Sequence, residues 1–470
     1  MALDVATFES ICPSRFISFT IPNPTCSDSL LRVAVLDSPV QPTDSPQVGA
    51  MLVPEGRETD WIFSTELGQL QLLFSSPGIS RLILIGNQFK EDDFSRNIYH
   101  RPLDCSLQQQ GFEVWSKPLL LALSPRSLFR NGIPEIPILS YEDSLVSSVV
   151  IHSCVGYHVG EILVEDVEIE SEGEVHHGCH KREFRRRMRF KKMPNLIQTE
   201  IRIVPETDPC LNSVRIGDMG FIPDLQVLVH PYLAPMVASL SLISEYLEGQ
   251  IQNGFKPKAL CLGVGGGALL TFLTTQLGFE VMGVDNETEV LRVAKDYFGL
   301  EDGECMHVVV GDAIKYIKKL AYHENLQTQS SFADCGDNGL SHLVDGKVNH
   351  KFDVVMVDLD SSDIRRGVSS PPLEFVRKNV LLAVKLALSE SGILAINVIP
   401  STNSFYENLV NHFLEAFEDL YKIDVGNGEN FVLIATVSPQ VFPVGDHSNA
   451  FLMRLKAVIP EVYINSIVKI

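Results

Sequence analysis

Residues 258–285 read KALCLGVGGGALLTFLTTQLGFEVMGVD, and this stretch decides the fold class. Its hydrophobic pattern predicts a buried strand at 258–263, a helix at 267–277 and a second strand at 279–285. The connection after the first strand is rich in glycine, which lets a backbone turn sharply and approach a ligand closely. The helix that follows presents N–H groups at its N-terminus. The stretch therefore predicts a nucleotide-binding α/β unit, whose loop glycines are Gly263, Gly265, Gly266 and Gly267.

The same alternation continues towards the C-terminus. Strands that alternate with helices are typical of a parallel sheet with helices on both faces. The last two predicted strands, 420–425 and 431–437, are joined by GNGEN, which predicts an antiparallel hairpin at the sheet edge. The predicted fold class is α/β, with a seven-strand Rossmann-like core of five parallel strands and a C-terminal hairpin. Further strands are predicted at 305–310, 352–358 and 392–398, and helices at 287–298, 312–323, 372–389 and 402–418.

Acidic residues stand at the ends of three successive predicted strands, namely Asp285, Asp312 and Asp358. Ligands of open α/β sheets bind at this carboxyl edge. Asp285 can accept both hydroxyl groups of a ribose, with a solvated strand-end acid as the structural alternative. Asp312 can accept from an adenine amino group. Asn286 and Ala313, which follow these two acids, complete the candidate cofactor-binding residues.

The acids and the closing hairpin favour S-adenosylmethionine over a nicotinamide dinucleotide. The loop by itself also fits the dinucleotide pattern G-x-G-x-x-G/A, with Ala268 in the last position. A sulfonium cofactor has no pyrophosphate, however, so the glycines need only pass over its methionine end. Its positive sulfur and ammonium groups are well served by carboxylates.

Several motifs carry a resemblance to a known family. They are LVPEGRETDW (52–61), GEILVEDV (160–167), FRRRMRF (184–190) with NLIQTE (195–200), HPYLAPM (230–236), LCLGVGGG (260–267), and FDVVMVDLDSSD (352–363) with Pro371 and Pro372. The chain resembles the spermidine-synthase-like S-adenosylmethionine-dependent methyltransferases. Over about residues 48–437 it resembles most closely the C-terminal half of the methyltransferase-like protein thirteen enzymes.

The resemblance implies an activity, a cofactor and a partner. That half methylates the α-amino group at the N-terminus of translation elongation factor 1-alpha, with S-adenosyl-L-methionine as cofactor. The lysine-directed half of the family has no counterpart in this chain. Polyamine synthases carry an Asp roughly where Gly266 stands, and a D-S-S-D-P run where this chain has Ile364 after Asp363. Both departures weaken an aminopropyl-transfer interpretation.

The candidate catalytic residues are Asp358, Asp360 and Asp363, whose acids suit a pocket for a cationic amine. The pattern leaves open which of them accepts the proton, if any. Glu58, Asp60 and Trp61 are candidate contributions from the N-terminal lobe, with a buried structural Arg57–Asp60 pair as the alternative. The predicted function is a protein N-terminal methyltransferase. A polyamine aminopropyltransferase and a non-catalytic binding module that keeps the fold are the alternatives.

Four segments are predicted. They are an N-terminal α/β lobe (1–150) with a weakly structured start, a β-hairpin segment (151–229), the methyltransferase core (230–440) and a C-terminal extension (441–470). Within the lobe, strands are expected in 48–63 and at 81–86, with a helix at 65–76. A helix is expected at 231–249 before the core. Residues 324–350 are polar and predict a surface insertion.

The hairpin segment has an uneven charge pattern. EILVEDVEIESEGE (161–174) has seven acidic residues and no basic one, whereas KREFRRRMRFKK (181–192) has eight basic residues and one acidic one. Period-two alternation predicts that Asp166, Glu168 and Glu170 share one face and that Arg185, Arg187, Arg189 and Lys191 share another. Antiparallel pairing then sets acids across from arginines. An ion-paired hairpin is favoured over a nucleic-acid patch or a docking surface.

Composition excludes several classes. The net charge of the 470-residue chain is −21, which makes nucleic acid an unexpected partner. The nine cysteines form no CxxC pair, and the N-terminus fits neither a secretory signal nor a transit peptide. We therefore expect a cytoplasmic protein without a membrane span. No metal is expected, because the one Cys/His cluster lacks a partner pair at finger spacing; it comprises Cys154, His176, His177, Cys179 and His180. The oligomeric state stays open.

Overall fold

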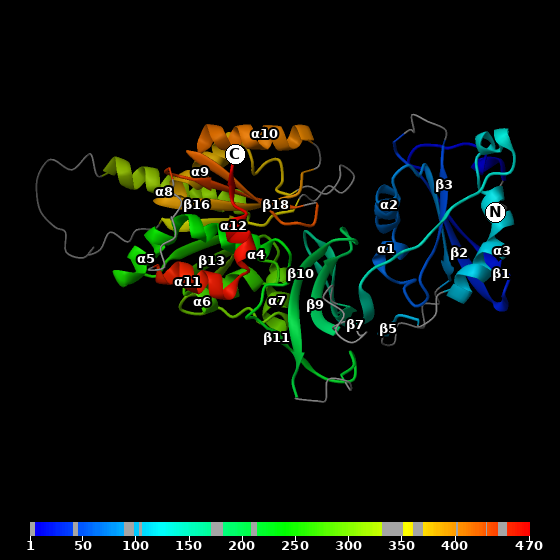
Figure 1. The fold of residues 1–470 in the computed structure, drawn as a ribbon, viewed down its shortest axis with the longest axis horizontal. Coiled ribbons are helices and arrows are strands. Elements are labelled where there is room, and N and C mark those ends of the chain that lie inside the picture. Colours follow the sequence, from blue (N-terminus) through cyan, green and yellow to red (C-terminus); the bar gives the residue numbers. More distant parts are fainter. Residues whose placement is uncertain are drawn as a thin grey trace, which may run out of the picture. The chain divides into compact units, whose positions relative to one another are not determined.

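The structure is a computed structural model, and it divides into two compact units. The first comprises residues 1–153, 161–197 and 205–220, and the second comprises 154–160, 198–204 and 221–470. Each unit is described by itself (Figure 1). The structure describes residues 5–40, 46–88, 98–102, 106–170, 182–207, 214–330, 351–360, 370–400, 403–428, 430–439 and 449–470.

The first unit contains a five-stranded sheet of order β1-β2-β4-β3-β6, with helices packed on both faces. The predicted strand–helix–strand pattern is confirmed as β3, α2 and β4. The start of the chain is predicted to be weakly structured, but residues Phe16–Asn23 and Cys26–Asp37 form the antiparallel pair β1–β2. The elements are β1 (Phe16–Asn23), β2 (Cys26–Asp37), β3 (Val48–Leu52), α1 (Trp61–Ser64), α2 (Glu66–Phe74), β4 (Arg81–Asn87), α3 (Ser106–Ala122) and β6 (Ile138–Leu139).

The first unit also holds most of β5 (Ile98–His100), β7 (Leu145–Gly156), β8 (Gly160–Glu170) and β9 (Arg182–Phe190). The predicted ion-paired hairpin is confirmed as β8–β9. The predicted pairing of faces is wrong, because Asp166 does not lie opposite the face of Arg185 and Arg187. Asp166 lies opposite Arg186, and their side chains pair at 2.6 Å. Glu168 likewise pairs with Arg182. Period two defines the two faces of each strand, but the register of the pair decides which faces meet.

The second unit is built on an eight-stranded sheet of order β14-β13-β12-β15-β16-β18-β17-β19. The first five strands in this order are parallel, and β16 pairs with β18 antiparallel, as β18 does with β17. The predicted five parallel strands and C-terminal hairpin are therefore confirmed. The strands are β12 (Lys258–Leu262), β13 (Glu280–Asp285), β14 (Met306–Val310), β15 (Phe352–Val357), β16 (Leu388–Val398), β17 (Asp419–Asp424), β18 (Phe431–Thr436) and β19 (Val468–Lys469).

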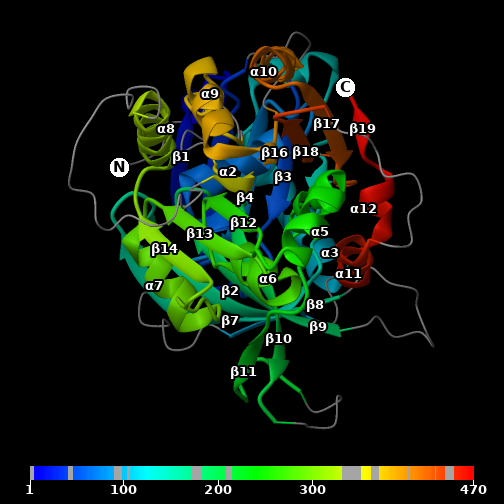
Figure 2. The ribbon, with the colours of Figure 1, turned by 90° about the vertical axis from the view of Figure 1, so that its left-hand side faces the viewer.

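Helices cover both faces of this sheet. Side chains of α8, α9 and α10 form one core with it, and those of α4 to α7 and α11 form the other. Figures 1 and 2 show α8, α9 and α10 together on one side of the sheet and α6 and α11 on the opposite side. The helices are α4 (Leu233–Ala238), α5 (Ser244–Gln252), α6 (Ala268–Leu277), α7 (Thr288–Tyr297), α8 (Ala313–Ser330), α9 (Lys378–Ala387), α10 (Asn403–Ala416), α11 (Ala450–Val458) and α12 (Glu461–Asn465).

Three element predictions need correction. The single helix predicted at 231–249 is three short pieces, with a 3₁₀ turn at Ser239–Ile243 between α4 and α5. Helix α8 extends to Ser330, into the predicted insertion, whose residues 331–350 lie outside the described residues. Helix α9 begins at Lys378 rather than 372, after a segment that contains Pro371 and Pro372. Proline lacks the N–H that a helix interior needs, which accounts for the late start.

The C-terminal residues pack on the same unit. Strand β19 pairs with β17, and Phe451 and Leu455 of α11 are buried in one of the two cores. The second unit also holds β11 (Phe221–Asp224) and most of β10 (Ile197–Pro205). Of the helices in the described ranges, none is both long and apolar enough to span a bilayer.

Candidate functional site

The glycine loop lies between β12 and α6, as predicted. Gly263, Gly265 and Gly267 have φ values of +87°, +52° and +81°, which L side chains rarely adopt. A Cβ on Gly263 would lie only 2.0 Å from the carbonyl oxygen of Asp358, which begins the connection after β15. The glycines are therefore required for two reasons: they permit the left-handed turns, and they let the loop approach the neighbouring strand end.

Every backbone N–H of this loop already has an acceptor within the protein. The N–H groups of Val264 and Gly265 donate to Asp285 Oδ2 at 3.0 and 3.3 Å. Gly266 N–H donates to Thr199 Oγ1 at 2.8 Å. The N–H groups of Gly263 and Gly267 donate to backbone carbonyls. A phosphate-binding loop offers such N–H groups to its ligand, and those of residues 263–267 are already paired within the protein.

Asp285 lies at the end of β13, beneath the glycine loop. Besides the two loop N–H groups, its carboxylate accepts from Glu287 N–H at 3.0 Å. Burial raises the pKa of Asp285 above its usual value, and these three backbone donors offset part of the rise. A carboxylate has about four acceptor sites. Asp285 therefore fixes the loop and keeps capacity for a ligand hydroxyl.

Asp358 follows β15 and lies in a hydrogen-bonded group. Tyr232 Oη donates to its Oδ2 at 2.8 Å, and Asn397 Nδ2 donates to its Oδ1 at 3.2 Å. Asn430 Nδ2 in turn donates to Asn397 Oδ1 at 3.0 Å. Burial raises the pKa of Asp358, and the bond from Tyr232, the nearby His230 and the bond from Asn397 offset part of that rise. The carboxylate is thus held rigidly at the carboxyl edge of the sheet.

Asp360 lies near Asp358. Burial and, secondly, the charge of Asp358 raise the pKa of Asp360 to about 7. Neither carboxylate pairs with Lys or Arg within the described residues. Two carboxylates that share a site resist ionising together, so this pair suits a cationic ligand or a shared proton. Asp363, the third candidate, lies outside the described residues.

The other candidate cofactor residues lie at the same edge of the sheet. Asp312 is exposed and follows β14, and its Oδ1 accepts from Lys315 N–H at 2.8 Å, so it begins α8. One carboxylate oxygen is left for a ligand. Ala313 is the first residue of α8, and Asn286 is exposed beside Asp285. The structure thus brings Asp285, Asp312 and Asp358 to one edge of the sheet, at the ends of β13, β14 and β15, with β12 between β13 and β15.

Sequence reasoning missed four residues of the site. Thr199, Tyr232 and Asn397 bond the loop or Asp358 as described. Glu287, which is 2% exposed, accepts from the backbone N–H groups of Tyr157, His158 and Val159, the turn between β7 and β8. Tyr232 and Thr199 lie inside quoted motifs, HPYLAPM and NLIQTE, but nothing in their local pattern distinguished them from their neighbours.

The candidates from the N-terminal lobe have structural partners in the first unit. Asp60 pairs with both Arg57 and Arg189, at 2.6 and 2.7 Å, and these arginines lower the pKa of Asp60 to about 2 against the effect of burial. The guanidinium of Arg189 lies over the Trp61 ring. The structure therefore supports the alternative of a buried Arg57–Asp60 pair.

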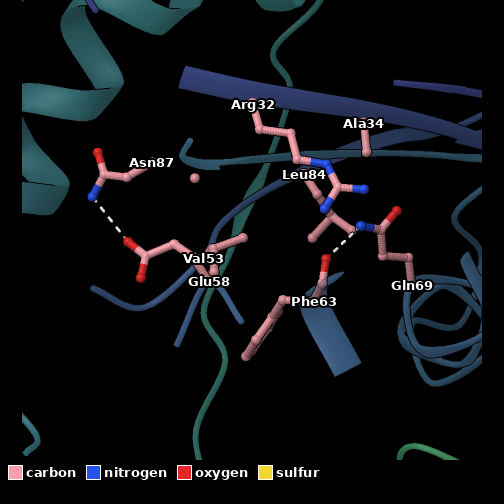
Figure 3. A pocket seen from close by; sticks show the side chains of 9 residues that line it. Arg32, Ala34, Val53, Glu58, Phe63, Gln69, Leu84 and Asn87 are labelled. Carbon is pink, nitrogen blue, oxygen red and sulfur yellow. Dashed lines mark hydrogen bonds between the residues drawn. The ribbon is translucent and has the colours of Figure 1, made fainter. Parts of the chain in front are cut away.

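Glu58 lines a shallow cavity in the lobe (Figure 3). The space measures about 270 Å³, counting solvent at its mouth. Glu58 Oε1 accepts from Asn87 Nδ2 at 2.9 Å, and Arg32 Nη1 donates to the Ser64 carbonyl at 3.1 Å. Residues of β2, β4 and the segments after β3 form its walls, all within the first unit. Glu58 therefore has a hydrogen-bond partner within the first unit, which is a structural role.

The residues of the second unit fit S-adenosylmethionine on their donor chemistry. The N–H groups of the loop are already hydrogen-bonded within the protein, and S-adenosylmethionine has no phosphate group that would need them. The half-buried pair Asp358 and Asp360 has no ion pair with Lys or Arg in the described part of the chain, and the cofactor carries a sulfonium and an ammonium group. Asp285 keeps acceptor capacity for ribose hydroxyls.

This mixed sheet and the acids at its carboxyl edge agree with the predicted Rossmann-like α/β fold class, although β19 adds an eighth strand to the seven that were predicted. Comparison with known proteins supports the resemblance. The chain is 26% identical over 412 residues to the eEF1A lysine and N-terminal methyltransferase of Xenopus laevis, covering 85% of this chain and 52% of that protein. It is 25% identical over 430 residues to the human protein of that name, covering 86% and 53%.

The chain thus spans about half the length of the curated relatives it matches. A structure of human methyltransferase-like protein 13 in complex with SAH is 23% identical and covers 50% of this chain and 93% of that chain, with a TM-score of 0.38. No protein-family model matches the chain. The predicted resemblance to methyltransferase-like protein thirteen is confirmed.

Proposed function

We propose that this protein is an S-adenosylmethionine-dependent methyltransferase that modifies the N-terminal α-amino group of a protein, elongation factor 1-alpha or a similar one. The carrying observation is the pair Asp358 and Asp360 beside the glycine loop, where the pKa of Asp360 is raised to about 7. The relatives' name, eEF1A lysine and N-terminal methyltransferase, supports the reaction class and the substrate.

The cofactor would lie along the carboxyl edge of the sheet. Asp285 would accept the ribose hydroxyls, Asp312 and Ala313 would receive the adenine, and Asp358 would face the cationic end. Gly263, Gly265 and Gly267 carry no side chains, which keeps the backbone of the loop accessible to a ligand there. When bound, S-adenosylmethionine supplies a methyl group on a positively charged sulfur, which a nitrogen lone pair can attack.

An amine must lose its proton before it can attack, and this requirement separates the two possible target groups. An α-amine has a pKa of about 7.7–8.0 and a lysine amine about 10.4. Deprotonation at pH 7 therefore costs about 1 kcal/mol for the α-amine and about 4.6 kcal/mol for lysine. An acceptor with a pKa near 7 matches the α-amine.

The acids of the site would first hold the ammonium form of the target and then take its proton. Tyr232 and Asn397 fix Asp358 through its two oxygens, so among the described residues Asp358 is the more restrained member of the pair. We assign proton acceptance to the Asp358–Asp360 pair, with Asp360 as its more readily protonated member at neutral pH. The burial of Tyr232 raises the pKa of its phenol well above the usual value. Tyr232 therefore stays neutral and remains a donor.

The test uses the full chain, labelled S-adenosylmethionine and two versions of the N-terminal peptide of elongation factor 1-alpha. One version has a free α-amine, the other is acetylated there, and both keep their lysines. We expect label only in the free peptide. Label in both would assign the reaction to lysine. Label in neither, with turnover of decarboxylated S-adenosylmethionine and putrescine instead, would favour the aminopropyltransferase alternative.

A further inference from the structure

Thr199 of β10 lies against the glycine loop, although it precedes the loop by 67 residues. Its Oγ1 accepts the Gly266 N–H at 2.8 Å. Only 6% of Thr199 is exposed, so water cannot readily replace this hydroxyl. The bond therefore holds the middle of the loop from a strand that comes before the sheet and helices of the core in sequence.

The same side chain also makes the closest approach to two of the loop glycines. A Cβ on Gly266 would lie 2.4 Å from Thr199 Cγ2, and one on Gly265 would lie 2.7 Å from Thr199 Oγ1. Cβ atoms essentially never make contacts this short, so Thr199 leaves no space for a side chain at Gly265 or Gly266. The methyl group fixes how close β10 comes, and the hydroxyl fixes the direction of the Gly266 N–H.

We propose that Thr199 is a positioning residue that holds the glycine loop in its cofactor-binding conformation. This inference rests on the proposed function, because it assumes that the loop receives S-adenosylmethionine. Thr199 completes a set of side chains that fix the loop from both sides. Asp285 holds Val264 and Gly265 from β13, and Thr199 holds Gly266 from β10.

Removal of the hydroxyl would act on cofactor affinity. Without Thr199 Oγ1, a buried Gly266 N–H lacks its acceptor, and the loop of the free protein relaxes to hydrate it. Cofactor binding must then restore the original loop conformation, and the cost of doing so appears as weaker binding. The loss of an acceptor for a buried N–H corresponds to about 5- to 100-fold in affinity.

The experiment measures binding of S-adenosylhomocysteine, the cofactor product, to the full chain by calorimetry. Thr199→Val keeps the shape and removes the hydroxyl, whereas Thr199→Ser keeps the hydroxyl. Thr274→Val is the matched control, because the Thr274 hydroxyl donates to the Leu270 carbonyl within α6, at 3.0 Å. We expect Thr199→Val to bind about 5- to 100-fold more weakly, with Thr199→Ser and Thr274→Val close to wild type.

The outcomes separate this inference from the proposed function. If the wild type fails to bind S-adenosylhomocysteine, the proposed function fails. If the wild type binds and Thr199→Val binds equally well, the positioning role fails. Should Thr199→Val not fold, hydrogen exchange of the cofactor-free wild type and of Thr199→Ser decides: a protected Gly266 amide in both supports the role, and rapid exchange overturns it.

Discussion

Asp360→Asn should stabilise the second unit and at the same time reduce its activity. Burial and the charge of Asp358 raise the pKa of Asp360 from its usual 3.8 to about 7. The folded state therefore holds this proton more tightly than the unfolded state does. Stability then falls as the pH rises through the window from about 4 to about 7, because the folded state must give up a proton that the unfolded state has already lost.

The size of the effect follows from the same pKa. A rise from 3.8 to about 7 corresponds to about 4 kcal/mol once Asp360 is fully ionised. Because Asp358 titrates together with Asp360, we expect a gain of about 2–4 kcal/mol in the free energy of unfolding for Asp360→Asn above about pH 8. The gain should shrink towards zero near pH 4, where both proteins are neutral at this position.

The assay is urea unfolding of wild type and variant at about pH 8.5 and about pH 5. The transition of the second unit is followed by itself, since two units need not unfold together. Asp296→Asn is the control, because Asp296 is half exposed and pairs only at the surface of α7. If Asp360→Asn changes the free energy of unfolding equally at both pH values, ionised Asp360 does not destabilise the folded state and the reasoning is refuted.

Three further variants test other parts of the site and the fold. Glu287→Gln should speed hydrogen exchange in residues 157–159 by at least about tenfold, because a charged acceptor of three N–H groups is lost; unchanged exchange would contradict the assigned bonds. Tyr232→Phe should lower kcat and shift the acid limb of its pH profile upwards, since Asp358 loses a donor to its ionised form; an unaltered profile would remove Tyr232 from the site. Arg189→Met should destabilise the first unit by about 3–5 kcal/mol in denaturant unfolding, because Asp60 keeps only one of its two arginines; a loss below about 1 kcal/mol would show that the network contributes little.

The sequence predicted the second unit well because its signals are local. The first four parallel strands are short apolar runs, and each ends in or is followed by Gly or Asp. The five parallel strands followed from the alternation of strands and helices, and the hairpin followed from the turn residues GNGEN. The same reasoning missed β1 and β2, because a stretch rich in Ser and Pro obscured the alternation in FISFTI (16–21) and the apolar run after Leu30.

The candidate site was predicted only in part, for a different reason. Asp285 and Asp358 stand at strand ends, so local pattern located them. Thr199 and Tyr232 act across 67 and 126 residues of sequence, and no local pattern shows which distant hydroxyl meets which loop. The charge-paired hairpin has the same limit: alternation showed that acids would meet arginines, but the register that pairs Asp166 with Arg186 is a property of the folded strands.

The central claim is tested most directly by mass spectrometry of the N-terminal peptide of elongation factor 1-alpha after incubation with S-adenosylmethionine and the full chain. Parallel reactions would contain wild type or Asp285→Ala, and binding of S-adenosylhomocysteine would be measured on the same preparations. The account predicts methylation of the α-amine by the wild type and a large loss in the variant. An unmodified N-terminus, with a wild type that binds the cofactor product, would contradict it.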